Sequence, residues 1–201
     1  MKVACCTRGR PREFDADAAL AAALRVFWSK GYEGASLSDL TEAMGITRPS
    51  LYAAFGNKEA LFKQALDLYE REKLDYIGAA LKEPTARKVA EHLLRSALEM
   101  QMSSSDPKGC MGVINAVACG AEAESIRAEV IHRGRVAKQG LVERFEQAKR
   151  EGDLPPETDA VGLTSYLIAI MQGLAVQGGA GASCRDLTGM IDTSLAMWPG
   201  K

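Results

Sequence analysis

The chain has 201 residues, of which 47% are hydrophobic and 25% charged, and its formal net charge is −1. This balance is ordinary for a folded globular protein, and the small net charge excludes a molecule that binds polyanions over its whole surface. No hydrophobic signal core follows the first residues, and no apolar run approaches the length of a bilayer span. We therefore expect a cytoplasmic protein without a membrane partner.

Basic residues are concentrated at the N-terminus. Residues 1–12 contain Lys2, Arg8, Arg10 and Arg12 and no acid. A basic arm on a near-neutral body suits a protein that touches phosphate at one end only, so residues 1–12 are interpreted as a flexible arm whose three arginines contact DNA. RGRPR also resembles the core of an AT-hook, which lies in a narrow minor groove, although general phosphate attraction by a disordered tail is an equally good explanation.

Three short helices are predicted next. Asp15 caps the first helix, which ends at Lys30 and Gly31. Ser36 begins the second with a sequence that resembles a capping box, and Gly45 ends it. After one further residue, the third helix begins.

The segment 36–55 has the features of a helix-turn-helix, in which a short exposed helix enters the major groove of DNA. Its third helix would place Leu51 and Phe55 inward. The residues of that helix expected to face outward at its start are Thr47, Arg48, Pro49 and Ser50. Arg48 has the chemistry to contact guanine or to bind a phosphate.

Two residues beyond the start of that helix are candidates for contact with the DNA backbone. Tyr52 is expected to point away from the inward face, where its hydroxyl can reach a phosphate. Lys58 opens the next helix, where free backbone N–H groups and a cation together favour an anion.

The rest of the chain is also helical in pattern, so the predicted fold class is all-α. Further helices are expected at about 58–81, 85–102, 110–118, 122–151, 159–177 and 185–198. We divide the chain into the arm at 1–12, a three-helix helix-turn-helix domain at 13–58 and a larger helical domain at 59–201.

The segment from Phe14 to Leu61 resembles the DNA-binding domain of the tetracycline-repressor (TetR) family. The stretch FWSKGYEGASLSDLTEAMGITRPSLYAAFGNKEAL contains the aromatic-x-x-x-G-aromatic start, the G-[IV]-[ST] turn, LY-x-x-F and K-E-x-L. The resemblance implies that residues 47–50 face bases and that Ser36, Tyr52 and Lys58 hold backbone phosphates. It also implies a homodimer built from the last two long helices and a ligand cavity in the C-terminal domain.

Both terminal helices carry a continuous apolar stripe. Either stripe has a simple explanation as core, but two in succession, in a protein whose target is expected to be palindromic, favour a four-helix interface between two copies. The residues predicted to form this interface are Leu163, Leu167, Ile170, Leu174, Leu187, Met190, Ile191 and Leu195.

A cavity between helices is the usual site for a small molecule, with solid core as the alternative at each position. The residues predicted to line it are Cys110, Met111, Ile114, Tyr166 and Met171. Cys110 follows a loop at the start of a helix, which suggests a sensor of oxidants or electrophiles, whereas a buried, inert thiol is the more common fate.

Signatures of catalysis and of metal or cofactor binding were not found. The chain lacks a G-x-S-x-G elbow and a phosphate-binding G-x-x-x-x-G-K-[ST] loop, and its two histidines stand apart from any ligand cluster. We therefore predict no enzyme, metal or cofactor, but a homodimeric repressor that binds palindromic double-stranded DNA and is released by a small-molecule effector. The alternatives are an architectural DNA-binding protein without a ligand and a small all-α thiol enzyme that uses Cys110.

Overall fold

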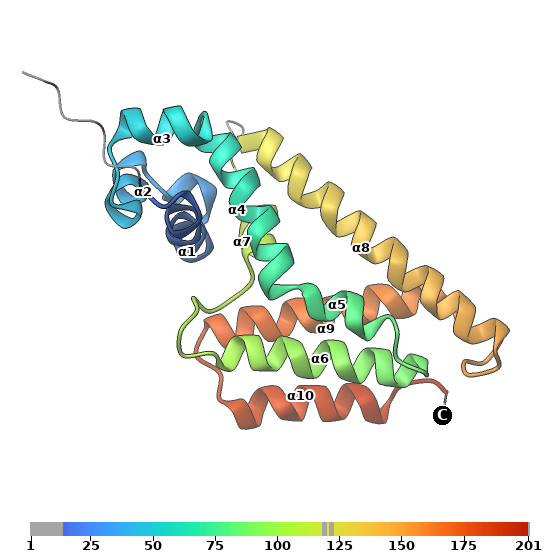
Figure 1. Cartoon of the computed structure of the whole chain (residues 1–201). Helices are drawn as coiled ribbons and strands as arrows, with labels where there is room; N and C mark the ends of the chain where they lie inside the picture. Colours follow the sequence, from blue (N-terminus) through green and yellow to red (C-terminus); the bar gives the residue numbers. More distant parts are fainter. Residues whose placement is uncertain (1–13, 118–119, 121–122, 201) are drawn as a thin grey trace, which may run out of the picture.

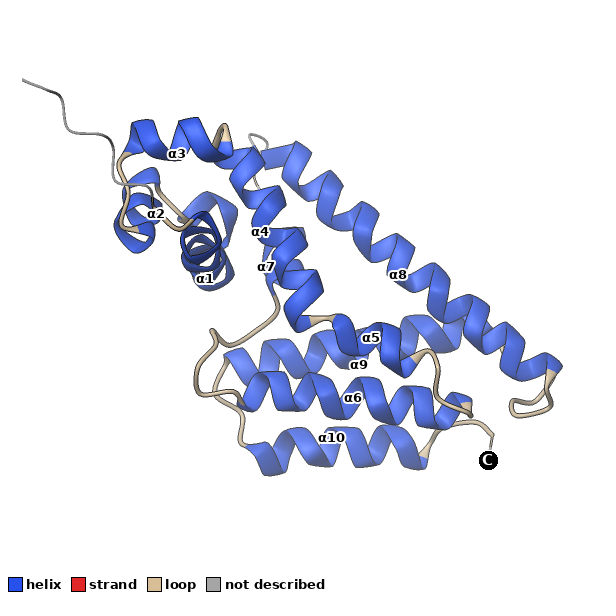
Figure 2. Cartoon of the chain, in the orientation of Figure 1, coloured by secondary structure: helices blue, strands red, loops and turns tan. Residues whose placement is uncertain are grey.

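A computed structural model describes residues 14–117, 120 and 123–200. Throughout these residues the regular structure is helical and no strand occurs, as the sequence predicted (Figures 1 and 2). The helices are α1 (Ala16–Gly34), α2 (Leu37–Met44), α3 (Arg48–Phe55), α4 (Lys58–Lys73), α5 (Asp75–Ala80), α6 (Ala86–Met102), α7 (Met111–Val117), α8 (Glu124–Arg150), α9 (Ala160–Gly179) and α10 (Cys184–Ala196).

Side-chain caps set the starts of the first four helices. The N-caps are Asp15, Ser36, Thr47 and Asn57, and each side chain accepts a hydrogen bond from a backbone N–H of the first turn. These bonds satisfy N–H groups that have no partner inside the helix. The short helices of the N-terminal unit therefore begin at positions that the sequence itself specifies.

A break within α1 lies where the sequence predicted the helix to end. Gly31 has φ +70°, a conformation that favours glycine, and its backbone leaves the helical path. The chain resumes a helical turn that ends at Gly34. The bend leads directly into the start of α2.

The N-terminal core is aromatic and includes residues from outside the first three helices. The ring of Phe27 lies 5.1 Å from that of Phe62, and the ring of Trp28 lies 4.9 Å from that of Tyr69, both edge to face. Met111 of α7 and Ile126 of α8 belong to the same cluster. Because α4 packs mainly in this cluster, the N-terminal unit is attached to the rest of the molecule by shared core.

The helix predicted to run continuously over 58–81 is broken at Leu74, which is a correction to the sequence analysis. α4 ends at Lys73 and α5 begins at Asp75, with Leu74 at φ −116° and ψ 9°. The break carries no proline or glycine, and the apolar spacing continues through it. The local sequence therefore gave no sign of the bend, which tertiary packing imposes.

The C-terminal domain packs α6, α8, α9 and α10 around a second core. In Figure 1, α6 lies between α9 and α10. Leu93 of α6, Phe145 of α8 and Leu167 of α9 are fully buried there. Phe145 also contacts Trp198, with 5.6 Å between ring centroids. The inner face of α9 packs on this cluster, so that its other face points outward.

α9 is the most apolar long helix of the described residues. Over an 18-residue window its length and composition are comparable to those of a membrane span, contrary to the expectation that no run approaches that length. Core helices of soluble proteins meet the same criterion, and this is therefore weak evidence for a membrane. Only 28% of the window is buried, which leaves apolar side chains on its outer face.

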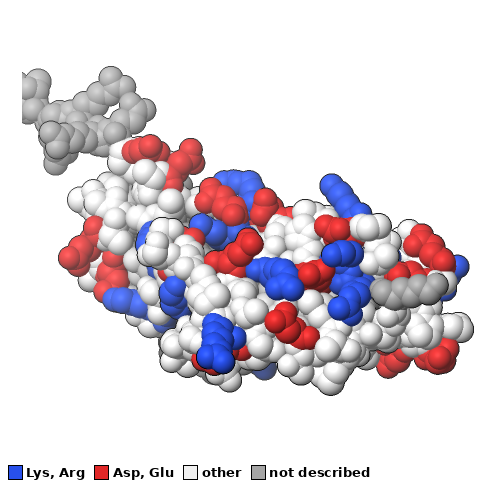
Figure 3. Space-filling view, turned by 90° about the horizontal axis from the view of Figure 1, so that it is seen from below, with Lys and Arg blue, Asp and Glu red and all other residues white. Residues whose placement is uncertain are grey.

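The face of the molecule seen in Figure 3 carries basic and acidic side chains in small, alternating groups. No broad patch of one sign covers that face of the described residues. This mixture of charges on that face is consistent with the near-zero net charge.

Candidate DNA-binding surface and ligand pocket

The start of α3 is exposed, with a polar first turn. Thr47, Arg48 and Pro49 are exposed, and Ser50 is half-buried. The Thr47 hydroxyl accepts from the backbone N–H of Ser50 and lies 2.9 Å from the Ser50 hydroxyl. The hydroxyl groups of Thr47 and Ser50, each a possible donor or acceptor, are thus held in place at the exposed N-terminal end of α3.

The opposite face of α3 anchors it. Leu51 is fully buried and Phe55 is 6% exposed. This division into a buried apolar face and an outward polar turn is what insertion into a groove requires. It is the arrangement that the sequence predicted for these residues.

Arg48 bridges the two helices of the helix-turn-helix. Its Nη2 donates to the Ser38 hydroxyl of α2 at 2.9 Å, and both residues are exposed. The bond holds the guanidinium at the outer edge of the turn. Such a group can bond a guanine edge or a phosphate in two-pronged fashion.

Ser36 is part of a complete capping box. Its hydroxyl donates to Asp39 at 2.7 Å and accepts from the Asp39 backbone N–H, while the Ser36 N–H donates to the same carboxylate. Lys30 lies 2.7 Å from that carboxylate, and these partners, Lys30 first, hold the pKa of Asp39 well below its usual range. A phosphate that bonds Ser36 therefore meets a charged carboxylate beside it.

Tyr52 lies at the surface within α3, and Lys58 is partly exposed at the start of the next helix, α4. The Tyr52 side chain is exposed. Lys58 begins α4, and its ammonium lies 4.4 Å from the centre of the Tyr32 ring. Partial burial lowers the pKa of Lys58, against the attraction of Glu33, which raises it. The three predicted arm residues, Arg8, Arg10 and Arg12, lie outside the described residues.

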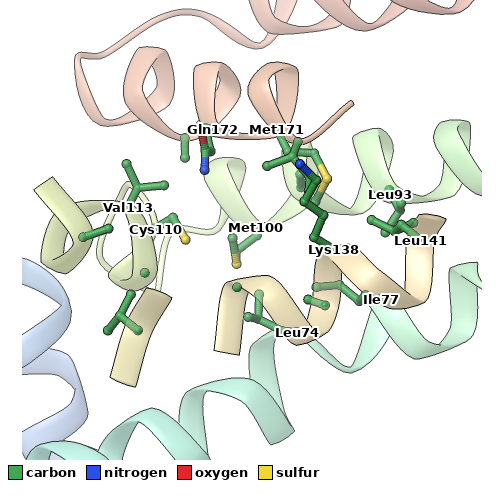
Figure 4. A pocket seen from close by; sticks show the side chains of 18 of the residues that line it. Leu74, Ile77, Leu93, Met100, Cys110, Val113, Lys138, Leu141, Met171 and Gln172 are labelled. Atoms are coloured by element: carbon green, nitrogen blue, oxygen red, sulfur yellow. The ribbon is translucent and has the colours of Figure 1, made fainter. Parts of the chain in front are cut away.

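A cavity of about 350 Å³ lies in the C-terminal domain, with walls from the end of α4 to α9. Figure 4 shows side chains converging on it from several helices. Of the five predicted lining residues, Cys110 and Met171 lie on its wall. Both come from segments far apart in the sequence, which only the tertiary fold brings together.

The other three predicted lining residues do not line this cavity, which corrects the sequence analysis. Met111 is fully buried in the N-terminal core, and Ile114 packs beside Gly31 and Gly109. Tyr166 is 37% exposed on the outer side of α9. The sequence predicted a short apolar helix at α7 and an apolar stripe on α9 but did not determine which side of each faces the cavity.

Four polar wall residues escaped the sequence analysis: Tyr76, Gln101, Lys138 and Gln172. A signal for one of them was present. Gln101 follows Leu94 and Ala97 at helical spacing, so a polar side chain occupies an otherwise apolar inner face. A buried polar residue in such a position calls for a specific partner.

Gln101 has that partner in the loop before α7. Its side chain is 1% exposed; its amide donates to the Gly109 carbonyl at 3.2 Å and accepts from the Gly109 N–H at 2.8 Å. The same carbonyl accepts from the indole N–H of Trp28 in α1. The cavity wall is thereby hydrogen-bonded to the N-terminal unit through a single peptide group.

Cys110, next in the chain, contacts α4 at the edge of the N-terminal core. The Tyr69 hydroxyl donates to its sulfur at 3.6 Å. Burial raises the pKa of Tyr69, and the neighbouring thiol adds to the shift. The phenol is therefore neutral and acts as a donor.

The predicted dimer-interface residues need correction. Five of the eight are buried in this chain's own core and are unavailable to a second copy: Leu167, Leu174, Leu187, Ile191 and Leu195. The remaining three, Leu163, Ile170 and Met190, are half-buried. The apolar stripes of α9 and α10 thus serve mainly the monomer core, which was the simpler of the two explanations.

Among the described residues, no group of three or more His, Cys, Asp or Glu side chains is arranged to hold a metal ion.

Comparison with known proteins shows two matched regions. Residues 19–65 match the family model described as bacterial regulatory proteins of the tetR family, and residues 89–180 match a tetracyclin repressor-like C-terminal domain. The HTH-type transcriptional repressor ComR of Escherichia coli (strain K12) is 34% identical over 195 residues, which cover 96% of this chain and 93% of ComR.

Solved structures agree in fold. A cysteine mutant of the TetR family transcriptional regulator CifR, in complex with 26-bp double-strand operator DNA, has a TM-score of 0.89 and 38% identity; the match covers 94% of this chain and 100% of CifR. A TetR regulator of Rhodococcus sp. RHA1 is 36% identical with a TM-score of 0.62, over 93% of this chain and 100% of the other.

Proposed function

This chain belongs to the tetR family of bacterial regulatory proteins, and we propose that it is a homodimeric repressor that recognises a palindromic operator and leaves it when a small molecule binds. The observation that carries the proposal is the polar first turn of α3, exposed on a buried apolar base. A short rigid helix of this kind can place its N-terminal side chains against base edges in the major groove.

Within that surface we assign two kinds of contact. Thr47, Arg48 and Ser50 are proposed to contact bases, with Pro49 shaping the helix start. Tyr52 and Lys58 are proposed to contact phosphates, because Tyr52 is exposed on α3 and Lys58 is half-exposed at the start of α4. Ser36, at the start of α2, is proposed to contact the DNA backbone. The arginines of the arm are proposed to add a general electrostatic attraction to phosphates.

Two copies are proposed to join through the outer face of α9. Tyr166, Ala169 and Val176 lie on that face at near-helical spacing and are exposed, Val176 at 58%. A closed two-fold dimer buries the same patch from both copies and presents two α3 helices to the two halves of a palindrome. The proposed dimer interface is therefore the outer face of α9, in place of the inner apolar stripes that the sequence predicted.

The effector is proposed to bind in the cavity that Cys110 and Met171 line. A ligand there contacts the wall that Gln101 and Gly109 link to Trp28. A ligand that binds one conformation of this wall more tightly than another increases the population of that conformation. If the favoured conformation binds DNA less well, the ligand releases the protein from DNA. CifR in its solved complex holds operator DNA, and ComR is named a repressor; both support the proposed direction of regulation.

Selection of bound sequences from a random DNA pool tests the proposal. We expect enrichment of one compact palindrome whose half-sites are about 10 bp apart, centre to centre, or a multiple of that spacing. Arg71→Ala serves as a control, since Arg71 is exposed near the far end of α4 and should leave the selected site unchanged. Binding spread over unrelated sequences would instead support the architectural alternative.

A further inference from the structure

The cavity in the C-terminal domain has one charged side chain on its wall, that of Lys138. No Asp or Glu lines it within residues 14–117, 120 and 123–200. We propose that the cavity takes a small organic acid whose apolar body fills the interior and whose carboxylate pairs with Lys138. This inference rests on the proposed function and names the chemical class of its effector.

The amine of Lys138 is hydrogen-bonded to a hydroxyl and not to a carboxylate of the described residues. It donates to the Ser165 hydroxyl at 2.8 Å, and among the described residues no carboxylate pairs with it. Other lysines do have such partners: Lys30, Lys63, Lys73, Lys88 and Lys149. The amine of Lys138 is therefore available to pair with an anion.

The position of Lys138 suits the carboxylate end of a ligand. Figure 4 shows its side chain at the pocket, and its amine lies at the Ser165 hydroxyl of α9. Lys138 is half-buried, so the charged end of a ligand at this point keeps some contact with water. A buried carboxylate is stable only when it is paired and hydrogen-bonded, and this amine supplies both the charge and the bonds.

The rest of the wall suits an apolar body. Leu74, Ile77, Leu93 and Leu141 come from four different helices or helix ends and converge on the interior. The volume of about 350 Å³ is near the lower end of the range for small-molecule sites, which favours a compact molecule. An organic cation of the same size is disfavoured, because it would meet a like charge and no acid among the described lining residues.

Binding of three matched eight-carbon probes tests the inference: octanoate, the neutral octanamide and the cationic octylammonium. Isothermal titration of the full-length protein without DNA gives the dissociation constants. We expect octanoate to bind about tenfold more tightly than octanamide, a modest gain because the amine is half-exposed, and octylammonium not to bind.

Lys138→Gln should weaken octanoate about tenfold and bring it to the level of octanamide, whereas Lys138→Arg should retain the preference for the acid. Lys82→Gln makes the same charge change at an exposed lysine away from the cavity and should leave octanoate binding unchanged. If Lys138→Gln fails to fold, the comparison of the three probes in the wild-type protein still decides whether the cavity prefers an acid.

The inference is overturned if octanamide or octylammonium binds as tightly as octanoate, if octanoate does not bind, or if Lys138→Gln retains the acid preference. These measurements contain no DNA, so their failure leaves the proposed DNA recognition standing. Failure of the proposed function would show instead as the absence of a selected palindrome.

Discussion

The indole N–H of Trp28 donates to the carbonyl oxygen of Gly109 at 3.2 Å, across 81 positions of sequence. This bond joins α1 of the DNA-binding unit to the loop that enters α7. Gly109 has φ +88°, so its peptide group takes a direction that other residues rarely allow. Because the Gln101 side chain bonds both the carbonyl and the N–H of Gly109 from the cavity side, the junction offers a short path between ligand and DNA surfaces.

Replacement of Gln101 by leucine should destabilise the protein. The N–H of Gly109 loses its buried partner, which corresponds to about 1–3 kcal/mol in the free energy of unfolding. Urea denaturation followed by circular dichroism measures the change. Gln172→Leu is the matched control on the same cavity, where the side chain is exposed, and should change stability by less. Equal stability of the two variants would contradict the role of the Gln101 bonds.

Arg48→Ala should reduce discrimination at one base position of the selected operator. The expected loss is about 1–3 kcal/mol if the guanidinium bonds a base edge, with little effect on folding because the residue is exposed. Binding measured on operators with each base changed in turn gives the discrimination at every position. An unchanged profile would remove Arg48 from the base-contacting set and leave it a phosphate ligand.

Lys58→Ala should weaken binding to all DNA sequences alike. If its ammonium contacts one phosphate, the slope of the logarithm of the binding constant against the logarithm of salt concentration falls by about 1. Titrations at several salt concentrations with the operator and with unrelated DNA measure that slope. A slope equal to that of the wild-type protein would argue that Lys58 serves only its contact with Tyr32.

Acid should remove the contribution of the α2 capping box. The pKa of Asp39 is lowered in the folded protein, chiefly by Lys30 and then by Ser36, so its ionised form adds stability above the unfolded pKa of about 3.9. That stability is lost as the pH falls through the lower, folded value. The Tm difference between the wild-type protein and Asp39→Asn should be constant from about pH 7 to 5 and narrow below about pH 4.

The same charge change in the first turn of α1, Asp17→Asn, provides the comparison for Asp39→Asn. A Tm difference for Asp39→Asn that widens on acidification would contradict the assigned role of its carboxylate.

Val176→Lys should prevent dimer formation while leaving the monomer folded. Val176 is 58% exposed on the outer face of α9, so its replacement disturbs no core packing, whereas two lysines facing each other in a two-fold interface repel. Sedimentation velocity gives the mass in solution. Val136→Lys, at a position 61% exposed on α8, is the control and should remain dimeric. A dimeric Val176→Lys protein would place the interface elsewhere.

The sequence by itself determined the helical class and the starts of the N-terminal helices. Caps such as Asp15, Ser36 and Thr47 act within one helical turn, and glycine at positions such as Gly45 ends a helix through its own backbone freedom. Periodicity placed Leu51 and Phe55 inward and therefore turned the start of α3 outward. These are short-range effects, and local sequence contains them.

Only the tertiary structure decided what each apolar stripe packs against. Leu167 and Ile191 have the same spacing whether they meet their own core or a second copy, because periodicity specifies a face and not its partner. The bend at Leu74, the inward side of α7 and the isolation of Lys138 from acids likewise depend on contacts between distant segments. Such contacts arise from the joint packing of many helices, which no single stretch of sequence encodes.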